Sequence, residues 1–132
     1  HRPIVAYASP SFKNLKKNFP ESLDNAPCIV PTKHSKVRND IEHFFDILEI
    51  EPQFMAETQD TALQKILAAK GDGVVFLPEF TTKEFVQNKK LIKLGVLDNV
   101  FAEYFLIYSK RIFENPALEL VIKQDFEKMR LG

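Results

Sequence analysis

The sequence predicts an α/β fold, in which β-strands alternate with α-helices along the chain. Short segments rich in Val, Ile or Phe alternate with longer segments in which apolar residues recur at helical spacing. Helix-capping residues and glycines separate the two kinds of segment. Strands that alternate with helices pair in parallel through right-handed crossovers, so we expect parallel pairing in one open sheet.

The expected strands are short apolar segments bounded by polar or turn-forming residues. They comprise residues 4–8, 28–30, 53–57, 73–77, 91–94 and 104–108. Before the fourth of these strands, Gly71, Asp72 and Gly73 are expected to form a turn rather than a nucleotide-binding loop.

Two long helices are expected to follow polar capping residues. The first begins at Ser35, and its apolar residues share one face that must pack on other elements, namely Val37, Ile41, Phe44, Phe45 and Leu48. The second is capped by Asp60 and ends near Gly71. Its expected inner face consists of Leu63, Ile66 and Leu67.

Two further helices are expected later in the chain. Thr81 and Glu84 have the spacing of a capping box, in which each side chain bonds the backbone N–H group of the other residue. Phe80 and Phe85 are spaced as the hydrophobic staple that accompanies such a helix start. The last helix is expected to open at Pro116.

The 132-residue chain has the composition of an ordinary globular domain. Hydrophobic residues make up 45% of it and charged residues 27%, which suits a chain with a real core. Eighteen basic residues balance eighteen acidic ones, so no net field would draw the chain onto nucleic acid or an anionic membrane. Cys28 lies alone in an apolar segment, which excludes an internal disulfide and predicts a buried, unreactive thiol.

The sequence also bears on where the protein resides. No segment has the length and apolar character needed to cross a bilayer, and the first residues lack the pattern of a signal peptide. We therefore expect a cytoplasmic protein with no membrane partner. The chain begins at His1 rather than Met, which predicts a fragment or a processed form of a longer protein.

Polar residues gather at three junctions between a strand and a helix, at residues 31–35, 58–61 and 78–82. In open α/β sheets, ligands bind at the carboxyl ends of the strands. Helix N-termini at that edge attract a carboxylate or another anion. Capping is the simpler role for Ser35, Asp60 or Thr81 taken alone. The expected convergence of all three junctions favours a ligand site.

Motifs for catalysis or metal binding are not evident in the sequence. His1, His34 and His43 lack the spacing of a metal site, and there is no nucleophile elbow or phosphate-binding loop. We therefore expect no catalytic residue, no metal and no cofactor. A small α/β enzyme that uses Asp60 or Glu79 as a base is the alternative, although carboxylates at helix starts are more often caps and dipole partners.

Four segments in order resemble the effector-binding domain of LysR-type bacterial transcriptional regulators. They are "PTKHSKVR", "PQFMAETQDTALQKILAAKGDGVVFLPE" and "EYFLIYSKR" followed by "NPALELVI". The similarity runs over nearly the whole chain, and the order and spacing of the segments are more specific than any one of them. Within the family, "PTKHSKVR", "DTAL", "GDG" and the "IYSKR" to "NPA" ending look most like the regulators of sodium/proton antiporter genes.

The resemblance implies a fold of two Rossmann-like lobes joined by two crossing strands, like that of type 2 periplasmic binding proteins. Residues 1–8 would then form the first crossing strand. Residues 9–102 would form one complete effector-binding lobe, regulatory subdomain II. Residues 103–132 would supply the returning strand and the C-terminal helix of the other lobe. The first half of that other lobe and an N-terminal winged helix-turn-helix would be missing from this chain.

The resemblance further implies an effector-sensing regulatory domain. Its partners would be a small-molecule or ion effector and a second copy of the chain, as a homodimer or higher homo-oligomer, with the helix after Ser35 and the strand at Gln53 in the dimer contact. DNA would be bound only through the missing domain. A solute-binding protein of the periplasmic type, which would carry an export signal, is the other alternative. With the third junction included, the expected effector-binding residues are Thr32, Lys33, His34, Ser35, Gln59, Asp60, Thr61 and Pro78.

Overall fold

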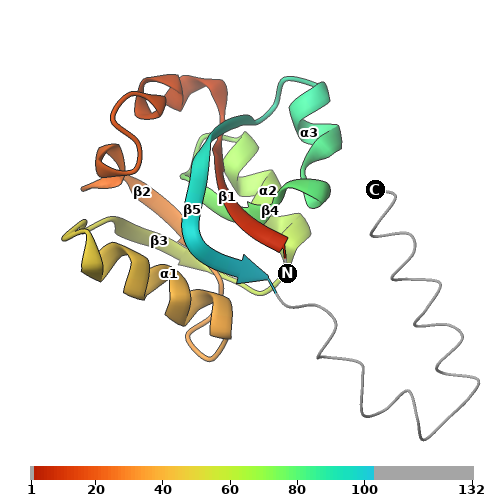
Figure 1. Ribbon diagram of the computed structural model, residues 1–132. Helices are drawn as coiled ribbons and strands as arrows, with labels where there is room; N and C mark the ends of the chain where they lie inside the picture. The colour runs from red at the N-terminus through yellow and green to blue at the C-terminus, as the bar shows by residue number, and fades with distance from the viewer. Residues whose placement is uncertain (1, 103–132) are drawn as a thin grey trace, which may run out of the picture.

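Five strands and three α-helices make up the described part of the chain, residues 2–102, in the computed structural model (Figure 1). The strands are β1 (Arg2–Ala8), β2 (Pro27–Val30), β3 (Gln53–Glu57), β4 (Val75–Pro78) and β5 (Ile92–Ala102). The α-helices are α1 (Lys36–Ile47), α2 (Thr61–Ala69) and α3 (Lys83–Gln87). Three 3₁₀ helices lie in the connections, η1 (Pro10–Lys16), η2 (Glu21–Leu23) and η3 (Glu79–Thr81). The predicted α/β class is confirmed, whereas the strand at 104–108 and the helix from Pro116 lie outside the described residues.

The strands form two sheets that join edge to edge. One sheet has the order β4-β1-β5 and the other pairs β2 with β3. A parallel bridge between Cys28 and Val74 joins them, with hydrogen bonds of 2.8 Å from the Ile29 N–H to the Val74 carbonyl and from the Val74 N–H to the Pro27 carbonyl. Gly73 permits this approach, because an added Cβ would lie 2.9 Å from the carbonyl oxygen of Pro27. The spatial order is therefore β3-β2-β4-β1-β5.

The expectation of parallel pairing is correct for only part of this sheet. β2 and β3 are parallel, but β1 runs antiparallel to both β4 and β5. The connection from β1 to β2 consists of two 3₁₀ helices and no α-helix, so β1 does not begin a strand-helix-strand crossover. Pairing direction depends on contacts between segments far apart in the chain, which local periodicity does not encode.

The fifth strand is longer than the sequence predicts. β5 was expected to end at Leu94 but continues to Ala102. Its pairing with β1 shifts register twice, and Asn99 adopts a positive φ of 65° within it. Asp98 and Asn99 disfavour strands by propensity, but the pairing with β1 carries the strand through them.

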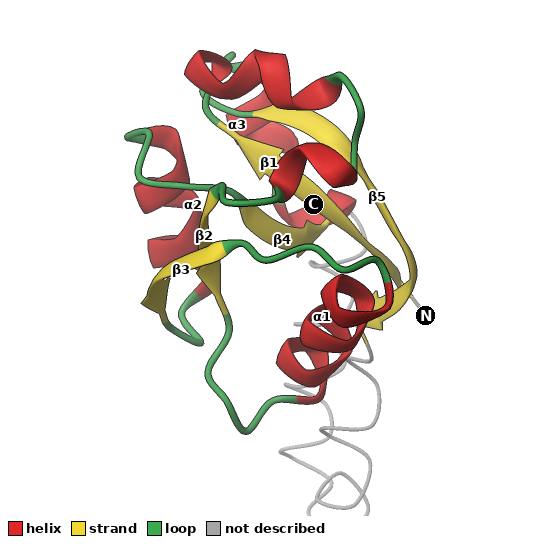
Figure 2. Cartoon of the chain, turned by 90° about the vertical axis from the view of Figure 1, so that its left-hand side faces the viewer, coloured by secondary structure: helices red, strands yellow, loops and turns green. Residues whose placement is uncertain are grey.

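Two apolar clusters pack against the opposite faces of the sheet. Successive residues of β1 alternate between the clusters, with Ile4 and Ala6 on one face and Val5 and Tyr7 on the other. α1, η1 and η2 cover the first face, and α2 and α3 cover the second (Figure 2). A strand buried on both faces reads as a continuous apolar run, as the segment at 4–8 does.

The capping residues predicted for α1 and α2 are confirmed. The Ser35 hydroxyl accepts the backbone N–H of Arg38 at 3.0 Å. One carboxylate oxygen of Asp60 accepts the N–H groups of Ala62 and Leu63 at 3.0 and 3.2 Å. α2 ends as expected in a turn at Gly71, which has a positive φ of 95° that favours glycine.

The predicted inner face of α2 is wrong for Leu63 and Ile66, whereas Leu67 packs against the second apolar cluster as expected. Leu63 and Ile66 are 41% and 51% exposed, while Gln64 and Ala68 are buried. The helix has two stripes at helical spacing, and periodicity alone selects the more apolar one. The structure turns the other stripe inward: Ala68 packs with strand residues such as Val5 and Ile29, and the Gln64 amide bonds the carbonyl of Thr58 at 2.6 Å.

The capping box predicted at Thr81 and Glu84 is also wrong. α3 is preceded by Thr82, and no side chain caps its N-terminus. The Thr81 and Thr82 hydroxyls instead donate to the carbonyls of Pro78 and Glu79 at 2.8 and 3.1 Å. These bonds close η3, a 3₁₀ turn that comes before the helix and satisfies both hydroxyls.

The predicted burial of Cys28 is confirmed, since its side chain is fully shielded in β2. Desolvation raises the pKa of the thiol to about 12. We therefore predict that Cys28 does not react with an aromatic disulfide reagent at pH 8 in the folded chain, because the thiolate is the reactive form. Absorbance of the released thiol measures the reaction, and full reaction in denaturant is the control. Rapid reaction of the folded chain would contradict the prediction.

Candidate functional site

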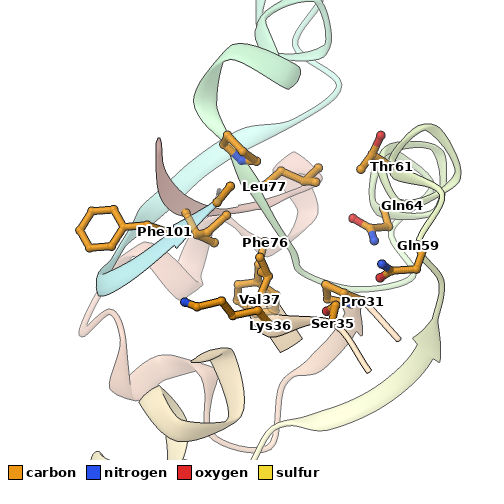
Figure 3. Close-up of a pocket in the computed structure, with 13 residues that line it drawn as sticks. Pro31, Ser35, Lys36, Val37, Gln59, Thr61, Gln64, Phe76, Leu77 and Phe101 are labelled. Carbon is orange, nitrogen blue, oxygen red and sulfur yellow. The ribbon is translucent and has the colours of Figure 1, made fainter. Parts of the chain in front are cut away.

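A cavity of about 480 Å³ lies where the three junctions meet, as the sequence predicts (Figure 3). Its polar wall comes from the starts of α1 and α2, and its apolar wall from β4 and the paired ends of β1 and β5. Its lining includes Ser35, Val37, Gln59, Thr61, Gln64 and Phe76. The carboxyl ends of β2, β3 and β4 therefore open onto one space.

The cavity includes some of the expected site residues and not others. Ser35, Gln59, Thr61 and Pro78 line it. The remaining four expected residues, Thr32, Lys33, His34 and Asp60, are not among its lining residues. Two of these support the lining from behind: the Thr32 N–H bonds the side chain of Gln59, and Asp60 caps α2. Lys33 and His34 are exposed on the loop that precedes α1.

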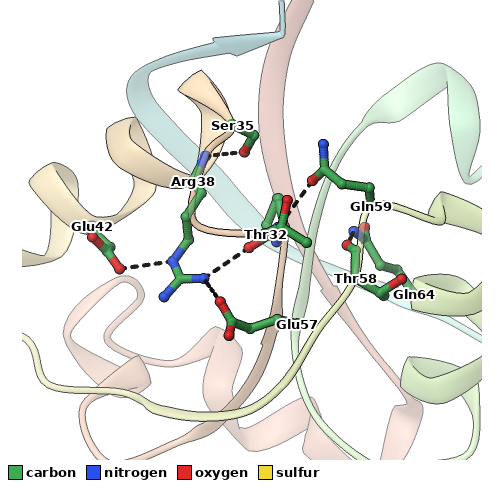
Figure 4. Close-up of polar contacts among 9 residues, drawn as sticks. Thr32, Ser35, Arg38, Glu42, Glu57, Thr58, Gln59 and Gln64 are labelled. Carbon is green, nitrogen blue, oxygen red and sulfur yellow. Dashed lines mark hydrogen bonds and ion pairs between the residues drawn. The ribbon is translucent and has the colours of Figure 1, made fainter.

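Arg38, part of the segment "PTKHSKVR" but not among the expected site residues, organises the first junction. Its side chain is only 4% exposed. One guanidinium nitrogen, Nη1, donates to the Pro31 carbonyl at 2.9 Å and to Glu57 at 2.5 Å, and Nε donates to Glu42 at 2.8 Å (Figure 4). The guanidinium also lies 4.7 Å from the centre of the Phe54 ring. Arg38 thereby joins the loop after β2 to the end of β3.

The charge of Arg38 is maintained despite its burial. Desolvation lowers the pKa of the guanidinium, but hydrogen bonds and charges from Glu57 and Glu42 outweigh it, so the net pKa is raised. A buried cation of this kind requires all of its partners. The sequence feature that could have identified Arg38 is its position three residues after Ser35, on the inner side of α1.

Two glutamine side chains at and after the second junction are each held by one backbone group. Gln59 Oε1 accepts the backbone N–H of Thr32 at 3.0 Å, which links the loops after β2 and β3. Gln64 Nε2 donates to the carbonyl of Thr58 at 2.6 Å. The second amide atom of each side chain is left toward the cavity, Nε2 of Gln59 and Oε1 of Gln64 (Figure 3). Gln64 was missed because its neighbours Leu63 and Ile66 dominate the apolar pattern.

Polar groups of the third junction are bonded to side chains of α2 and β5. Lys65 of α2 donates to the Thr81 carbonyl at 3.0 Å and lies 5.5 Å from the centre of the Phe85 ring. The carboxylate of Glu79 pairs with Lys93 at 3.7 Å. Neither Glu79 nor Asp60 lines the cavity, so the two carboxylates considered for an enzyme do not converge there.

Charge in and around the cavity is sparse. Within residues 2–102, the lining includes Lys36 and no carboxylate, and Lys36 pairs with Asp40 at 2.8 Å.

Residues 2–102 hold no cluster of three or more His, Cys, Asp or Glu side chains suited to a metal ion. No helix in this region has the length and apolar character to span a membrane.

The network around Arg38 yields a stability prediction. Replacement of Arg38 by Met should lower the free energy of unfolding by about 1–3 kcal/mol, because the carbonyl of Pro31 and the oxygens of Glu42 and Glu57 lose their donors. The matched control is Lys70→Met, which removes an exposed ion pair with Asp72 and should cost less than about 1 kcal/mol. Urea denaturation measures both, and equal effects would show that the network adds nothing.

The sequence matches the family model described as "LysR substrate binding domain" over residues 1–127. A curated relative, "Transcriptional activator protein NhaR" of Escherichia coli (strain K12), is 23% identical over 114 residues. That match covers 86% of this chain and 38% of the relative, so the chain spans well under half the length of the curated proteins that it matches.

Solved structures of the same family share the fold. The regulatory domain of HypT from Salmonella typhimurium aligns with a TM-score of 0.58 and 17% identity over 74% of this chain and 45% of that one. The regulatory domain of CcmR from Synechocystis PCC6803, in complex with 2-PG, aligns with a TM-score of 0.55 and 19% identity over 76% of this chain and 48% of that one. The family model covers nearly the whole chain and the solved structures align with it, so the chain belongs to the LysR substrate-binding domain family, with the type 2 periplasmic-binding-protein-like fold of that family.

Proposed function

We propose that this chain is the effector-sensing part of a LysR-type transcriptional regulator and binds a small polar or anionic ligand in the cavity. One observation carries the proposal: polar groups from two helix starts, at Ser35 and Thr61, meet the side chain of Gln59 on a single cavity of about 480 Å³. A cavity of this size suits a small ligand. The CcmR regulatory domain, a structural relative, binds 2-PG.

The expected division of the chain is part of the proposal. Residues 9–102 are proposed as one lobe, with residues 1–8 as the first crossing strand and residues 103–132 as a part of the other lobe. The pairing of Arg2 with Ala102 and of Pro3 with Phe101 supports this division. Because of that pairing, the described chain begins and ends side by side, as two crossing strands would require.

The candidate residues then divide by role. Ser35, Gln59, Thr61 and Pro78 contact the effector directly, since they line the cavity. Thr32 and Asp60 act on it indirectly, through Gln59 and through the α2 N-terminus. Lys33 and His34 are kept as candidate contacts because they are exposed on the same loop.

Regulation would follow from a change in the closure of the two lobes. An effector that binds one arrangement more tightly than the other shifts the population toward it, and the affinity difference limits the size of the shift. The proposed output is the geometry of a DNA-binding domain outside this chain. On this proposal the protein is cytoplasmic and performs no catalysis. The family match favours this function over that of an exported solute-binding protein.

A second part of the proposal concerns self-association. Exposed apolar side chains occur on β3 and on the helices before and after it in the chain: Phe54 and Met55 on β3, Ile47 and Leu48 at the end of α1, and Leu63 and Ile66 on α2. β3 is also an edge strand, because β2 is its only partner in the described sheet. Open strand edges and large apolar surfaces favour pairing with another chain. We assign this surface to the homodimer.

Ligand binding tests the proposed effector site. We expect a saturable rise in melting temperature with a member of a panel of small carboxylates, amino acids and alkali cations at fixed ionic strength. Replacement of Thr61 by Val should weaken that ligand about fivefold or more, because a cavity-lining hydroxyl is lost. Thr61 is exposed in the free chain, so folding should be preserved. Ser11→Ala, on η1 and away from the cavity, is the control, and unchanged affinity in Thr61→Val would remove Thr61 from the site.

Light scattering tests the proposed dimer surface. The chain should form dimers or larger assemblies as concentration rises, and Met55→Lys should shift it toward monomer because the lysine would place a charge in the contact. Met55 is 61% exposed, so the monomer tolerates this change. Val86→Lys alters an exposed apolar residue of α3, outside the surface, and should have no effect. A chain that is monomeric at every concentration would refute the surface.

A further inference from the structure

Oε1 of Gln64 is a polar group in the cavity that has no hydrogen-bond partner among the described residues. Only 2% of the Gln64 residue is exposed. Its Nε2 donates to the Thr58 carbonyl at 2.6 Å, which orients the amide with Oε1 toward the cavity (Figure 3). This oxygen accepts no hydrogen bond from a described residue. No side-chain nitrogen or oxygen of the described residues is both fully shielded from solvent and without a partner, so Oε1 itself is not fully shielded. It is therefore an acceptor that is open only to the cavity, and its missing partner is a donor.

Gln59 offers the opposite group beside it. Its Oε1 is occupied by the backbone N–H of Thr32 at 3.0 Å, so Nε2 is the free end of the amide. Nε2 has no described partner, and Gln59 lines the same cavity. An amide nitrogen donates and does not accept, so the ligand atom that meets it is an acceptor. Backbone groups thus set the orientation of both amides before a ligand arrives.

The two helix N-termini at the cavity differ in how well each would bind an anionic group of a ligand. At the start of α2, the Asp60 carboxylate already accepts two N–H groups and supplies the charge that the helix dipole favours. At the start of α1, Ser35 is a neutral cap that accepts only the Arg38 N–H, and Val37, which lines the cavity, is the second residue of the helix, so its N–H has no partner within it. An anionic group is therefore favoured at the α1 side of the cavity.

The remaining wall is apolar. Val37, Phe76 and Leu77 line it together with Ile4 from β1. The cavity, at about 480 Å³, is also larger than a bare carboxylate requires. The ligand that uses this wall carries an apolar group.

We propose that the cavity selects α-hydroxy or α-amino carboxylates with an apolar side chain. The carboxylate lies at the α1 N-terminus and accepts from Gln59, the adjacent hydroxyl or ammonium group donates to Gln64, and the side chain packs on the apolar wall. This inference rests on the proposed function, because it takes the cavity to be the effector site. It narrows the ligand class from polar or anionic molecules to those with a donor next to the carboxylate.

Four ligands of one carbon skeleton test the inference by titration calorimetry with the full chain. Leucate and leucine carry the donor as a hydroxyl and as an ammonium group, isocaproate lacks the donor, and leucinamide lacks the carboxylate. We expect leucate or leucine to bind about tenfold or more tightly than isocaproate, and more tightly than leucinamide, since an unpaired Gln64 acceptor carries a desolvation cost. The better of the two identifies the donor.

Gln64→Met separates recognition from a structural role. It removes the acceptor and keeps the length of the side chain, so the preference over isocaproate should disappear. A purely structural Gln64 would instead weaken all ligands in proportion and leave the preference unchanged. Gln53→Met is the matched control, because Gln53 also donates through Nε2, to Asn25 at 2.7 Å, but lies on β3 outside the cavity. It should leave the preference intact.

The outcomes also separate this inference from the proposed function. Binding of isocaproate as tight as that of the better of leucate and leucine overturns the role of the donor, and leucinamide binding as tight as leucine overturns the role of the carboxylate. If isocaproate binds that tightly and Thr61→Val weakens it, the cavity is still the effector site and only the ligand class is wrong. If none of the four ligands binds, the inference fails, and the wider ligand panel decides the proposed function independently.

Discussion

The geometry of the site depends on the hydrogen bonds and ion pairs that the buried guanidinium of Arg38 makes. The guanidinium holds the carbonyl of Pro31, after β2, against the carboxylate of Glu57, at the end of β3. These two points are where the polar loops leave the sheet. Since the loops carry Ser35 and Gln59, this shielded charged side chain holds them at a fixed separation, together with the bond from the Thr32 N–H to Gln59. A buried charge tolerates little displacement, because each lost partner leaves an uncompensated group.

A division of labour among polar residues follows from this arrangement. Asp60 and the hydroxyls of Thr81 and Thr82 satisfy backbone groups at helix or turn starts. Gln59 and Gln64 are also bonded to the backbone, but each by only one end of the amide. Backbone partners thus orient the free ends at no further cost on binding, which is how a rigid scaffold prepares a site for a ligand.

The same packing explains why apolar side chains are left at the surface. α2 turns Gln64 and Ala68 toward the sheet, so Leu63 and Ile66 face outward. β3 is an edge strand with both Phe54 and Met55 exposed. Phe54 is also covered on one side by Arg38. The proposed dimer surface therefore meets the loops that line the cavity at the contact between Phe54 and Arg38.

Much of the fold and part of the site were predictable from the sequence. Period and capping signals are local, and they predicted the strands, the starts of α1 and α2 at Ser35 and Asp60, and the junctions that meet at the cavity. They could not determine the antiparallel direction of β1, the full length of β5 or the inward face of α2. Each of these depends on contacts between distant segments, such as the pairing of Arg2 with Ala102. The sequence by itself determined which residues are polar at the sheet edge. Only the tertiary structure decided that Gln64 also lines the cavity and that its Oε1 faces the cavity. The orientation of the amide rests on the hydrogen bond from Nε2 to the Thr58 carbonyl, whose position the whole fold sets.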